Sequence, residues 1–223
     1  MNTGFTEKLL KLIGDKYPLC ELPTDGYDSL RVSGMRFSIK AYRAEGLGHV
    51  SIMNASGFFG LMRMDTLIIN PTQIDLPLLS YDGIYAMGND TRIIELYDTM
   101  LNPCSLDSLY RVRERCSDIR ERDPGKHWYD GIKLPQSISK KAKKDKSGRL
   151  DKLSEEYLGE YLALQADKVA GEENKLEKQR KSAVYVEGLL ENGGPSTDVF
   201  VKGLGRERTA RLFRHILFGT KEG

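Results

Sequence analysis

The stretch LRVSGMRFSIK, residues 30–40, contains two short runs in which apolar and polar side chains alternate. The apolar residues occupy every second position on each side of Ser33-Gly34. Alternation with a period of two is typical of a strand that buries one face. Ser and Gly suit the tight turn between two such strands. The stretch therefore predicts a β-hairpin, and we expect it to open a larger sheet.

Four further strands are predicted downstream of this hairpin. Their boundaries are 49–55, 61–69, 78–87 and 92–97, and the segments between them are rich in Gly, Asn or Asp. Most of these connections are too short to hold a crossover helix, so consecutive strands should pair as antiparallel neighbours. Residues 27–101 are thus predicted to form an antiparallel meander.

Helical patterns lie on both sides of the predicted sheet. Residues 1–26 contain an amphipathic helix and a lead-in, and residues 104–219 are mainly helical, with apolar side chains at three- and four-residue spacing. The predicted helices cover 105–121, 150–165, 172–190 and a last segment around 210–217. The run 140–146, rich in Lys, is predicted to be a loop. We expect one α+β domain over residues 1–223.

Composition describes an ordinary soluble protein. The 223 residues carry 34 Lys and Arg against 32 Asp and Glu, a formal charge of +2. No apolar run reaches the roughly 18–20 residues that span a bilayer, and the N-terminus lacks the pattern of a signal peptide. Three cysteines without C-x-x-C spacing favour a reducing compartment. We expect a cytoplasmic protein.

The motifs of common cofactor enzymes are missing. Two G-x-G sequences, at 46–48 and 203–205, lack the third glycine and the βαβ context of a dinucleotide site. There is no phosphate-binding loop, no H-E-x-x-H and no G-x-S-x-G. The three histidines, His49, His127 and His215, are scattered. We therefore expect neither a bound metal nor a tightly bound cofactor.

Positive charge is concentrated in one stretch. Arg111–Arg149 holds thirteen Lys or Arg residues against six Asp or Glu, about +7 in a chain of +2. This stretch is either a solvated surface or a docking site for an acidic partner. Nucleic acid is the weaker choice because aromatic residues suited to base stacking are not interleaved with the charges. We expect no nucleic-acid partner and no membrane partner.

Carboxylates within the predicted strands are candidates for chemistry. Asp65 and Asp82 lie in neighbouring strands that are otherwise largely apolar, and Asp198 follows a Gly-Gly-Pro break. A charged group inside such a strand is disfavoured unless it is paired or functional. Solvent-facing decoration is the alternative for each. We expect Asp65 and Asp82 to share a surface, where an apolar pocket would keep protons on them near neutral pH.

Several segments resemble the ferredoxin-dependent bilin reductases. The strand LPLLSYDGIY resembles that family's "LP-x-F-G-x-D" strand, the next strand resembles its "I-D-L-x-P" segment, and HWYD resembles its Trp-containing loop. The tail is similar to the family's "Y-x-x-Y…DPA…F…FG…FLF" ending. The segments that carry this resemblance are 76–85, 93–103, 127–137, 185–195, Phe200 and 213–218.

This resemblance implies an α/β/α sandwich with a central antiparallel sheet. It implies reduction of a linear tetrapyrrole such as biliverdin, with single electrons from ferredoxin and protons from protein side chains. Reduced ferredoxin would be an external donor rather than a bound cofactor. Ferredoxins are acidic, so the basic stretch Arg111–Arg149 becomes a candidate ferredoxin docking site.

The resemblance also assigns catalytic candidates. Asp82 matches the family's principal strand aspartate and is the first choice as proton donor to the bilin. Asp65 falls where some members carry His and others Asn or Asp, so it is a candidate partner that tunes Asp82 or protonates another ring. His49 matches a strand histidine of some members if the hairpin at 57–60 is two residues longer here.

Candidate substrate-binding residues follow from the same comparison. The strand position at which the family often has Glu corresponds to Ser51 or Met53 here. Gly194 replaces the Asp of the "DPA" segment, and Asp198 is a candidate substitute for it. Arg63 and Lys40 are candidates for holding the propionate groups. These departures leave the regiospecificity open.

Other functions remain open at this level. Within the superfamily, the alternative is an enzyme similar to red chlorophyll catabolite reductase. From another class, the alternative is a noncatalytic bilin- or haem-binding carrier. A third is an interaction domain that docks acidic partners through Arg111–Arg149. We expect a monomer because no long uncovered apolar stripe is visible.

Overall fold

The computed structural model describes residues 4–194 and 196–220, so the outermost parts of the predicted domain, 1–3 and 221–223, lie outside it. One antiparallel eight-stranded sheet dominates the fold, in the order β1-β3-β4-β5-β6-β7-β8, with β2 paired to β3. Its strands are β1 (Leu19–Leu22), β2 (Ser29–Val32), β3 (Met35–Ala44), β4 (Gly48–Gly57), β5 (Met62–Asn70), β6 (Leu78–Ala86), β7 (Asn89–Tyr97) and β8 (Ile138–Lys143).

The predicted meander is confirmed. Val32 pairs with Met35 across the predicted hairpin turn, and Ser33 and Gly34 both adopt positive φ, 51° and 78°. Two successive residues with positive φ define the turn whose twist matches that of the flanking strands. Strands β3 to β7 then pair consecutively, each with its neighbour in sequence.

The two edge regions of the sheet differ from the sequence prediction. β1 lies in the segment expected to be a lead-in, and β8 contains most of the Lys-rich run that was predicted to be a loop. Lys140 is buried there, and its ammonium group lies 2.7 Å from Glu121 Oε1 and donates to the Ile119 carbonyl. The loop prediction was wrong because pairing with β7 and this local partner offset the cost of burying the charge.

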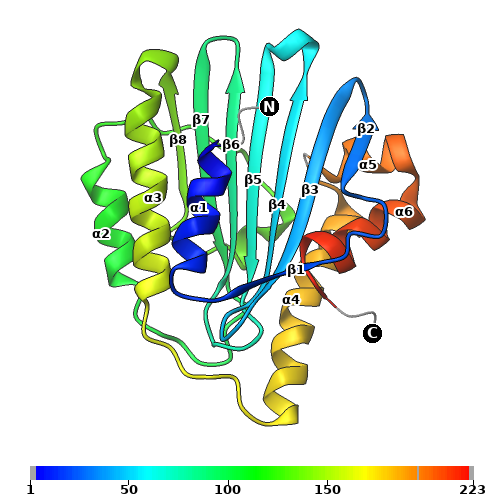
Figure 1. Ribbon diagram of the computed structural model, residues 1–223. Helices are drawn as coiled ribbons and strands as arrows, with labels where there is room; N and C mark the ends of the chain where they lie inside the picture. Colours follow the sequence, from blue (N-terminus) through cyan, green and yellow to red (C-terminus); the bar gives the residue numbers. More distant parts are fainter. Residues whose placement is uncertain (1–3, 195, 221–223) are drawn as a thin grey trace.

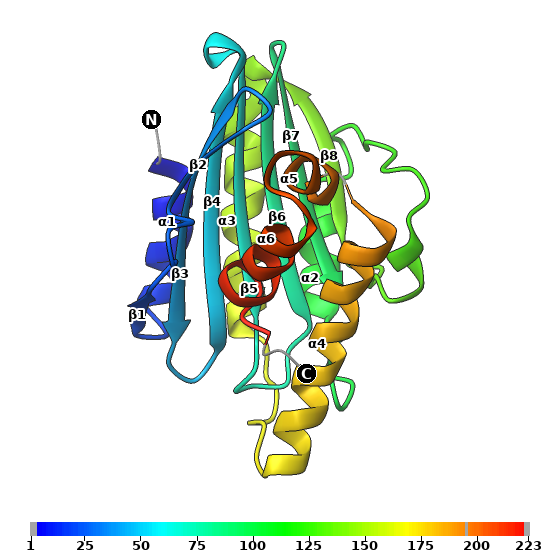
Figure 2. The same cartoon turned by 90° about the vertical axis from the view of Figure 1, so that its right-hand side faces the viewer.

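Helices cover both faces of the sheet (Figures 1 and 2). One core joins the sheet to α1 (Gly4–Gly14), α2 (Asp107–Arg115) and α3 (Ser147–Ala163). The other joins it to α4 (Glu172–Asn192), α5 (Thr197–Leu204), α6 (Arg206–Arg211) and the π-helical turn η4 (Leu212–Leu217). The fold is an α+β sandwich of the α/β/α kind, as expected. Helix α2 is shorter than predicted, and α5 was not predicted.

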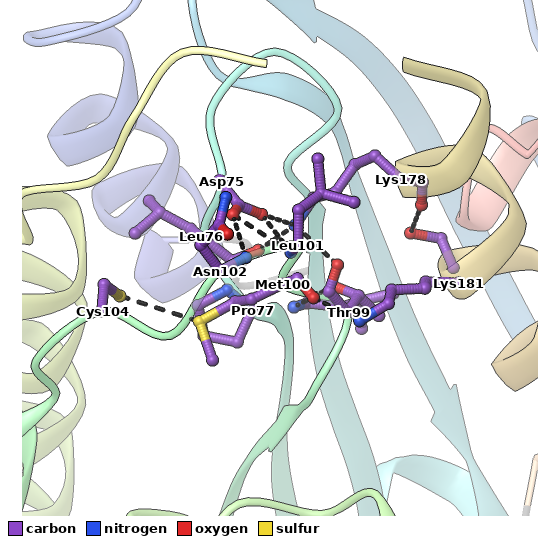
Figure 3. Close-up of polar contacts among 12 residues, drawn as sticks. Asp75, Leu76, Pro77, Thr99, Met100, Leu101, Asn102, Cys104, Lys178 and Lys181 are labelled. Atoms are coloured by element: carbon purple, nitrogen blue, oxygen red, sulfur yellow. Dashed lines mark hydrogen bonds and ion pairs between the residues drawn. The ribbon is translucent and has the colours of Figure 1, made fainter. Parts of the chain in front are cut away.

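A buried ion pair fixes the start of α4 against one end of the sheet (Figure 3). The Lys178 ammonium group lies 3.1 Å from Asp75 Oδ1 and donates to the carbonyls of Leu76 and Thr99. Asp75 accepts the backbone N–H groups of Leu101 and Asn102. Burial lowers the pKa of Lys178 to about 8, against the opposing effect of Asp75. The pair orients α4, whose other end lies over the candidate site described below.

None of the described helices has both the length and the apolar character needed to cross a bilayer. Within the same residues, no group of three or more His, Cys, Asp or Glu side chains is arranged to hold a metal ion.

Candidate functional site

A cavity of about 190 Å³ lies between the sheet and the C-terminal helices. Strands β4 to β7 form its floor, α4 and the segments around α5 and η4 form its roof, and the loop before η2 (Trp128–Gly131) closes one side. Its lining is mostly apolar and aromatic, with a few acids and hydroxyl groups, as is typical of small-molecule sites. The polar residues among its lining are Thr66, Ser80, Asp82, Glu95, Arg122, His127, Ser196 and Thr197.

Asp82 lies at the centre of the cavity floor. Cross-strand pairing places it in one row with Met53, Thr66 and Ile93, so all four share the cavity face. The Thr66 hydroxyl donates a hydrogen bond of 2.5 Å to Asp82 Oδ1. Burial raises the pKa of Asp82 to about 6; the Thr66 hydrogen bond opposes that rise, and the Glu95 charge adds to it. This carboxyl group exchanges protons near neutral pH.

Glu95 is a second acid on the same floor, on the neighbouring strand β7. The Tyr97 hydroxyl donates to Glu95 Oε2 at 2.6 Å, and the Lys133 ammonium group lies 3.8 Å from Oε1. Tyr97 stacks on Tyr185 of α4 with ring centroids 3.9 Å apart. Two carboxyl groups therefore face the cavity from adjacent strands, one held by a threonine and the other by a tyrosine and a lysine.

The loop that closes the side of the cavity is attached to α4 through an aromatic side chain. His127 and Tyr129 line the cavity and stack on each other at 4.9 Å. Between them, Trp128 packs against α4 at Gly188, where an added Cβ would lie 2.2 Å from the indole ring. The Trp128 indole N–H donates to the Gly193 carbonyl at 3.1 Å. The wall of the cavity thus depends on the fit between one indole and one glycine.

Asp65 does not share a surface with Asp82, and that prediction was wrong. Thr66 pairs with Asp82 and Asp65 pairs with Gly83, so the two acids point to opposite faces of the sheet. Arg63 and Lys40 are also on the face opposite the cavity. Arg63 is two residues from Asp65 on the same strand, so both point to the same face. Lys40 is exposed and pairs with Ile52, the residue next to the cavity residue Met53. The register of the hairpin decided this, because a shift of one residue exchanges the two faces.

Asp65 belongs instead to a polar cluster under α1 and α3. It is buried, its Oδ2 lies 3.5 Å from Arg63 Nε, and its Oδ1 has no hydrogen-bond partner. Burial raises its pKa, against the opposing charges of Arg63 and Arg92. Arg63 and Arg92 also lie over the Tyr85 ring, at 3.8 and 4.5 Å from its centroid. Asp65, Arg63 and Tyr85 border a separate open cavity on that face.

His49 and Ser51 face the same side of the sheet as Asp82 but do not line the cavity. His49 Nε2 bonds the Ile216 carbonyl at 2.9 Å, and the Ser51 hydroxyl donates to the Leu217 carbonyl at 2.7 Å. Burial lowers the pKa of His49. Asn70 completes the set by donating to the Phe218 carbonyl. These side chains satisfy the last carbonyls of the C-terminal segment and hold it on the sheet.

Of the two remaining predicted substrate-binding residues, one lines the cavity and the other does not. Met53 lines the cavity. Asp198 is exposed in the first turn of α5, beside Gly193, and does not line the cavity. Of the eight predicted site residues, only Asp82 and Met53 contribute to the cavity lining.

Ion pairs within the chain occupy part of the basic stretch Arg111–Arg149. Arg115 pairs with Glu156, Arg149 with Asp118, and Lys133 with Asp130 and Glu95. Docking of ferredoxin through this stretch stays a prediction that depends on the cations left outside these pairs.

Sequence reasoning missed several residues of the cavity. Glu95 has the same signal as Asp82, a carboxylate between apolar residues of a predicted strand, and the same argument would have selected it. His127, Tyr129 and Tyr185 lack this pattern, although they fall in the segments 127–137 and 185–195 that carry the family resemblance. They come from a loop and a helix far along the chain, and only tertiary packing brings them to the strands.

Comparison with known proteins identifies the fold. No protein-family model matches the chain, and no curated protein matches it. Among solved structures, the crystal structure of phytochromobilin synthase from tomato in complex with biliverdin is similar, with a TM-score of 0.81 over 100% of this chain and 84% of that one. The sequence identity is 12%, so the likeness is one of fold.

Proposed function

We propose that this protein binds a linear tetrapyrrole of the biliverdin type in the cavity above Asp82 and reduces it. The observation that carries the proposal is a carboxyl group with a pKa near 6 at the centre of an apolar and aromatic cavity. The support from comparison is a shared fold with a synthase whose structure contains biliverdin. Reduced ferredoxin is the proposed source of electrons, as the sequence resemblance implies.

The chemistry assigned to the cavity is proton delivery. Reducing one double bond of the bilin consumes two electrons, which a one-electron donor supplies singly, and two protons. Each electron makes the bilin more basic, so the proton on Asp82 moves to it and is replaced from solvent. With a pKa of about 6, about one Asp82 in ten carries a proton at pH 7. Thr66 holds the carboxyl group in place.

The cavity must widen to admit this substrate. Its volume of about 190 Å³ is below the roughly 300–1,000 Å³ of sites for drug-sized ligands. The loop that carries His127 and Tyr129 closes one side of the cavity, and Trp128 attaches it to α4. We assign entry of the bilin to movement of this loop.

Binding and reduction are tested separately. Because Trp128 is the only tryptophan and lies beside the cavity wall, bilin binding should quench its fluorescence and change the bilin absorption spectrum. Anaerobic addition of reduced ferredoxin should then consume the bilin. Asp82→Asn should retain binding and lose at least about a hundredfold in rate, the usual loss when a general acid is removed. Asp198→Asn, on an exposed carboxylate outside the cavity, is the control.

Three results bear on the proposal. If biliverdin alters neither the tryptophan emission nor its own spectrum, the bilin site is wrong. Binding without consumption by reduced ferredoxin would identify a noncatalytic bilin carrier. Normal turnover by Asp82→Asn would leave the site but remove Asp82 as the proton donor.

A further inference from the structure

Three hairpin turns and the end of β8 meet at one end of the sheet, the upper end in Figure 1. The turns join β2 to β3, β4 to β5 and β6 to β7. Lys143 pairs with Asn89, and the Lys144 N–H donates to the Gly88 carbonyl, so the end of the Lys-rich run lies against the last of these turns. We call this region the hairpin end.

Large apolar side chains project from the hairpin end. Phe59 is fully exposed, Met87 is 94% exposed, Leu61 is 73% exposed and Phe58 is 59% exposed. These residues form two separate tips, one on the β4–β5 turn and one on the β6–β7 turn. Exposed apolar groups of this size, gathered in one region, mark an interaction surface.

The backbone holds these side chains outward at a cost. Phe58, Phe59 and Met87 have φ values of 51°, 56° and 51°, in the left-handed region that bulky side chains rarely adopt. Glycine or asparagine would fit those positions with less strain. Neither folding nor solubility is served by a bulky apolar residue there, which points to a function in contact with another surface.

Positive charge surrounds the tips. Arg31 and Arg36 face each other across the β2–β3 hairpin and are exposed. Lys143, Lys144 and Lys146 are exposed beside the β6–β7 turn. None of these five cations has an ion pair among the described side chains. Of the nearby acids whose side chains the structure describes, Asp65 and Asp90 are buried and Asp151 pairs with Arg92.

We propose that the hairpin end docks on an anionic lipid surface. The apolar tips enter the boundary between headgroups and acyl chains, and the five cations contact the headgroups. A lipid surface suits isolated protruding side chains because it needs no matching pit, whereas a folded partner would need one for each tip. This surface is separate from the cavity of the proposed function, although its three lysines belong to the basic stretch Arg111–Arg149. It departs from the expectation, drawn from sequence, of no membrane partner.

Co-sedimentation with vesicles tests the proposal. The wild-type protein should sediment with vesicles of equimolar phosphatidylcholine and phosphatidylglycerol at low salt and should stay in solution with pure phosphatidylcholine. Phe59→Asn and Met87→Asn should each weaken binding about tenfold, the effect of one large apolar side chain. Asparagine tolerates the left-handed backbone, so these variants should fold. Leu176→Asn and Val184→Asn, at sites 65% and 61% exposed on α4, are the matched controls.

The charge contribution has its own pair of variants. Lys143→Gln with Lys144→Gln should reduce binding to the anionic vesicles, and Lys168→Gln with Lys175→Gln, which changes the net charge equally on exposed sites elsewhere, should not. Equal binding to both vesicle types, equal losses in tip and control variants, or no sedimentation would overturn the proposal. No sedimentation, together with a higher KM for reduced ferredoxin in the tip variants, would assign the hairpin end to a protein partner instead.

Discussion

At the scale of the residue, Asp82 is a carboxyl group whose environment works against its charge. Burial raises its pKa from 3.8 to about 6, and the single Thr66 hydrogen bond does not offset this. Strand interiors avoid such groups unless they are paired or functional. Asp65, on the adjacent strand β5, also has a raised pKa, but its side chain faces the opposite core. The raised pKa that the two acids share therefore does not place them in one site.

The raised pKa of Asp82 predicts a pH-dependent gain in stability on substitution. The folded state binds this proton more tightly than the unfolded state, so Asp82 weakens the fold above pH 6, and the penalty disappears as the pH falls towards about 4. Asp82→Asn should raise the free energy of unfolding by roughly 1–3 kcal/mol at pH 7 and by little near pH 4. Urea unfolding at both values measures this.

The control for that measurement is Asp198→Asn, because Asp198 is exposed and lies outside the cavity. Its free energy of unfolding should follow that of the wild type at both pH values. A loss of stability in Asp82→Asn at pH 7 would show that the ionised carboxylate is favoured in the fold and would contradict the raised pKa.

At the scale of the element, α4 depends on its buried ion pair. Lys178→Met leaves the Asp75 charge buried without its cation and should cost about 3–5 kcal/mol of folding free energy. Adding Asp75→Asn removes the uncompensated charge and keeps an acceptor for the Leu101 N–H, so the double variant should recover most of the loss. Thermal and urea unfolding of the three proteins measures this; a double variant no more stable than the single one would contradict the pairing.

The loop over the cavity gives a second prediction at this scale. Gly188→Ala would place a Cβ 2.2 Å from the Trp128 ring, so the indole must leave its position on α4. The fluorescence of this single tryptophan should shift to longer wavelength because the indole becomes more exposed to water. Biliverdin should quench it faster because the loop over the cavity is no longer attached to α4. Gly159→Ala on α3, where an added Cβ meets no atom within 4 Å, is the control. An unchanged emission spectrum would show that Trp128 does not attach the loop.

At the scale of the whole molecule, the sheet separates two cores with different roles. Leu153 lies in the core under α1, α2 and α3, and Leu217 lies in the opposite core and lines the cavity. Leu153→Ala and Leu217→Ala should each cost about 2–5 kcal/mol of stability. Only Leu217→Ala should change the affinity for biliverdin and the spectrum of the bound bilin. Equal effects on binding would mean that the cores are coupled through the sheet.

Local pattern determined much of this fold. Alternation and turn residues located strands β2 to β7, because short connections leave antiparallel pairing as the only option. The local pattern did not predict β8, where Lys140 is buried next to Glu121. The residues around Lys140 in the sequence do not indicate that Glu121 pairs with it. The same reasoning selected Asp82 from its apolar strand and would have selected Glu95.

Only tertiary structure decided which residues form the cavity. The register between β5 and β6 places Asp65 and Asp82 on opposite faces of the sheet. The sequence locates the hairpin turn only to within one residue, and a shift of one residue moves every side chain of the strand to the other face. Tyr129 and Tyr185 line the same cavity as Asp82 through packing between segments distant in the chain. The sequence by itself determined an antiparallel sheet, flanking helices and one acid out of place; the packing of α4 and the C-terminal segment on one face made that acid part of a site.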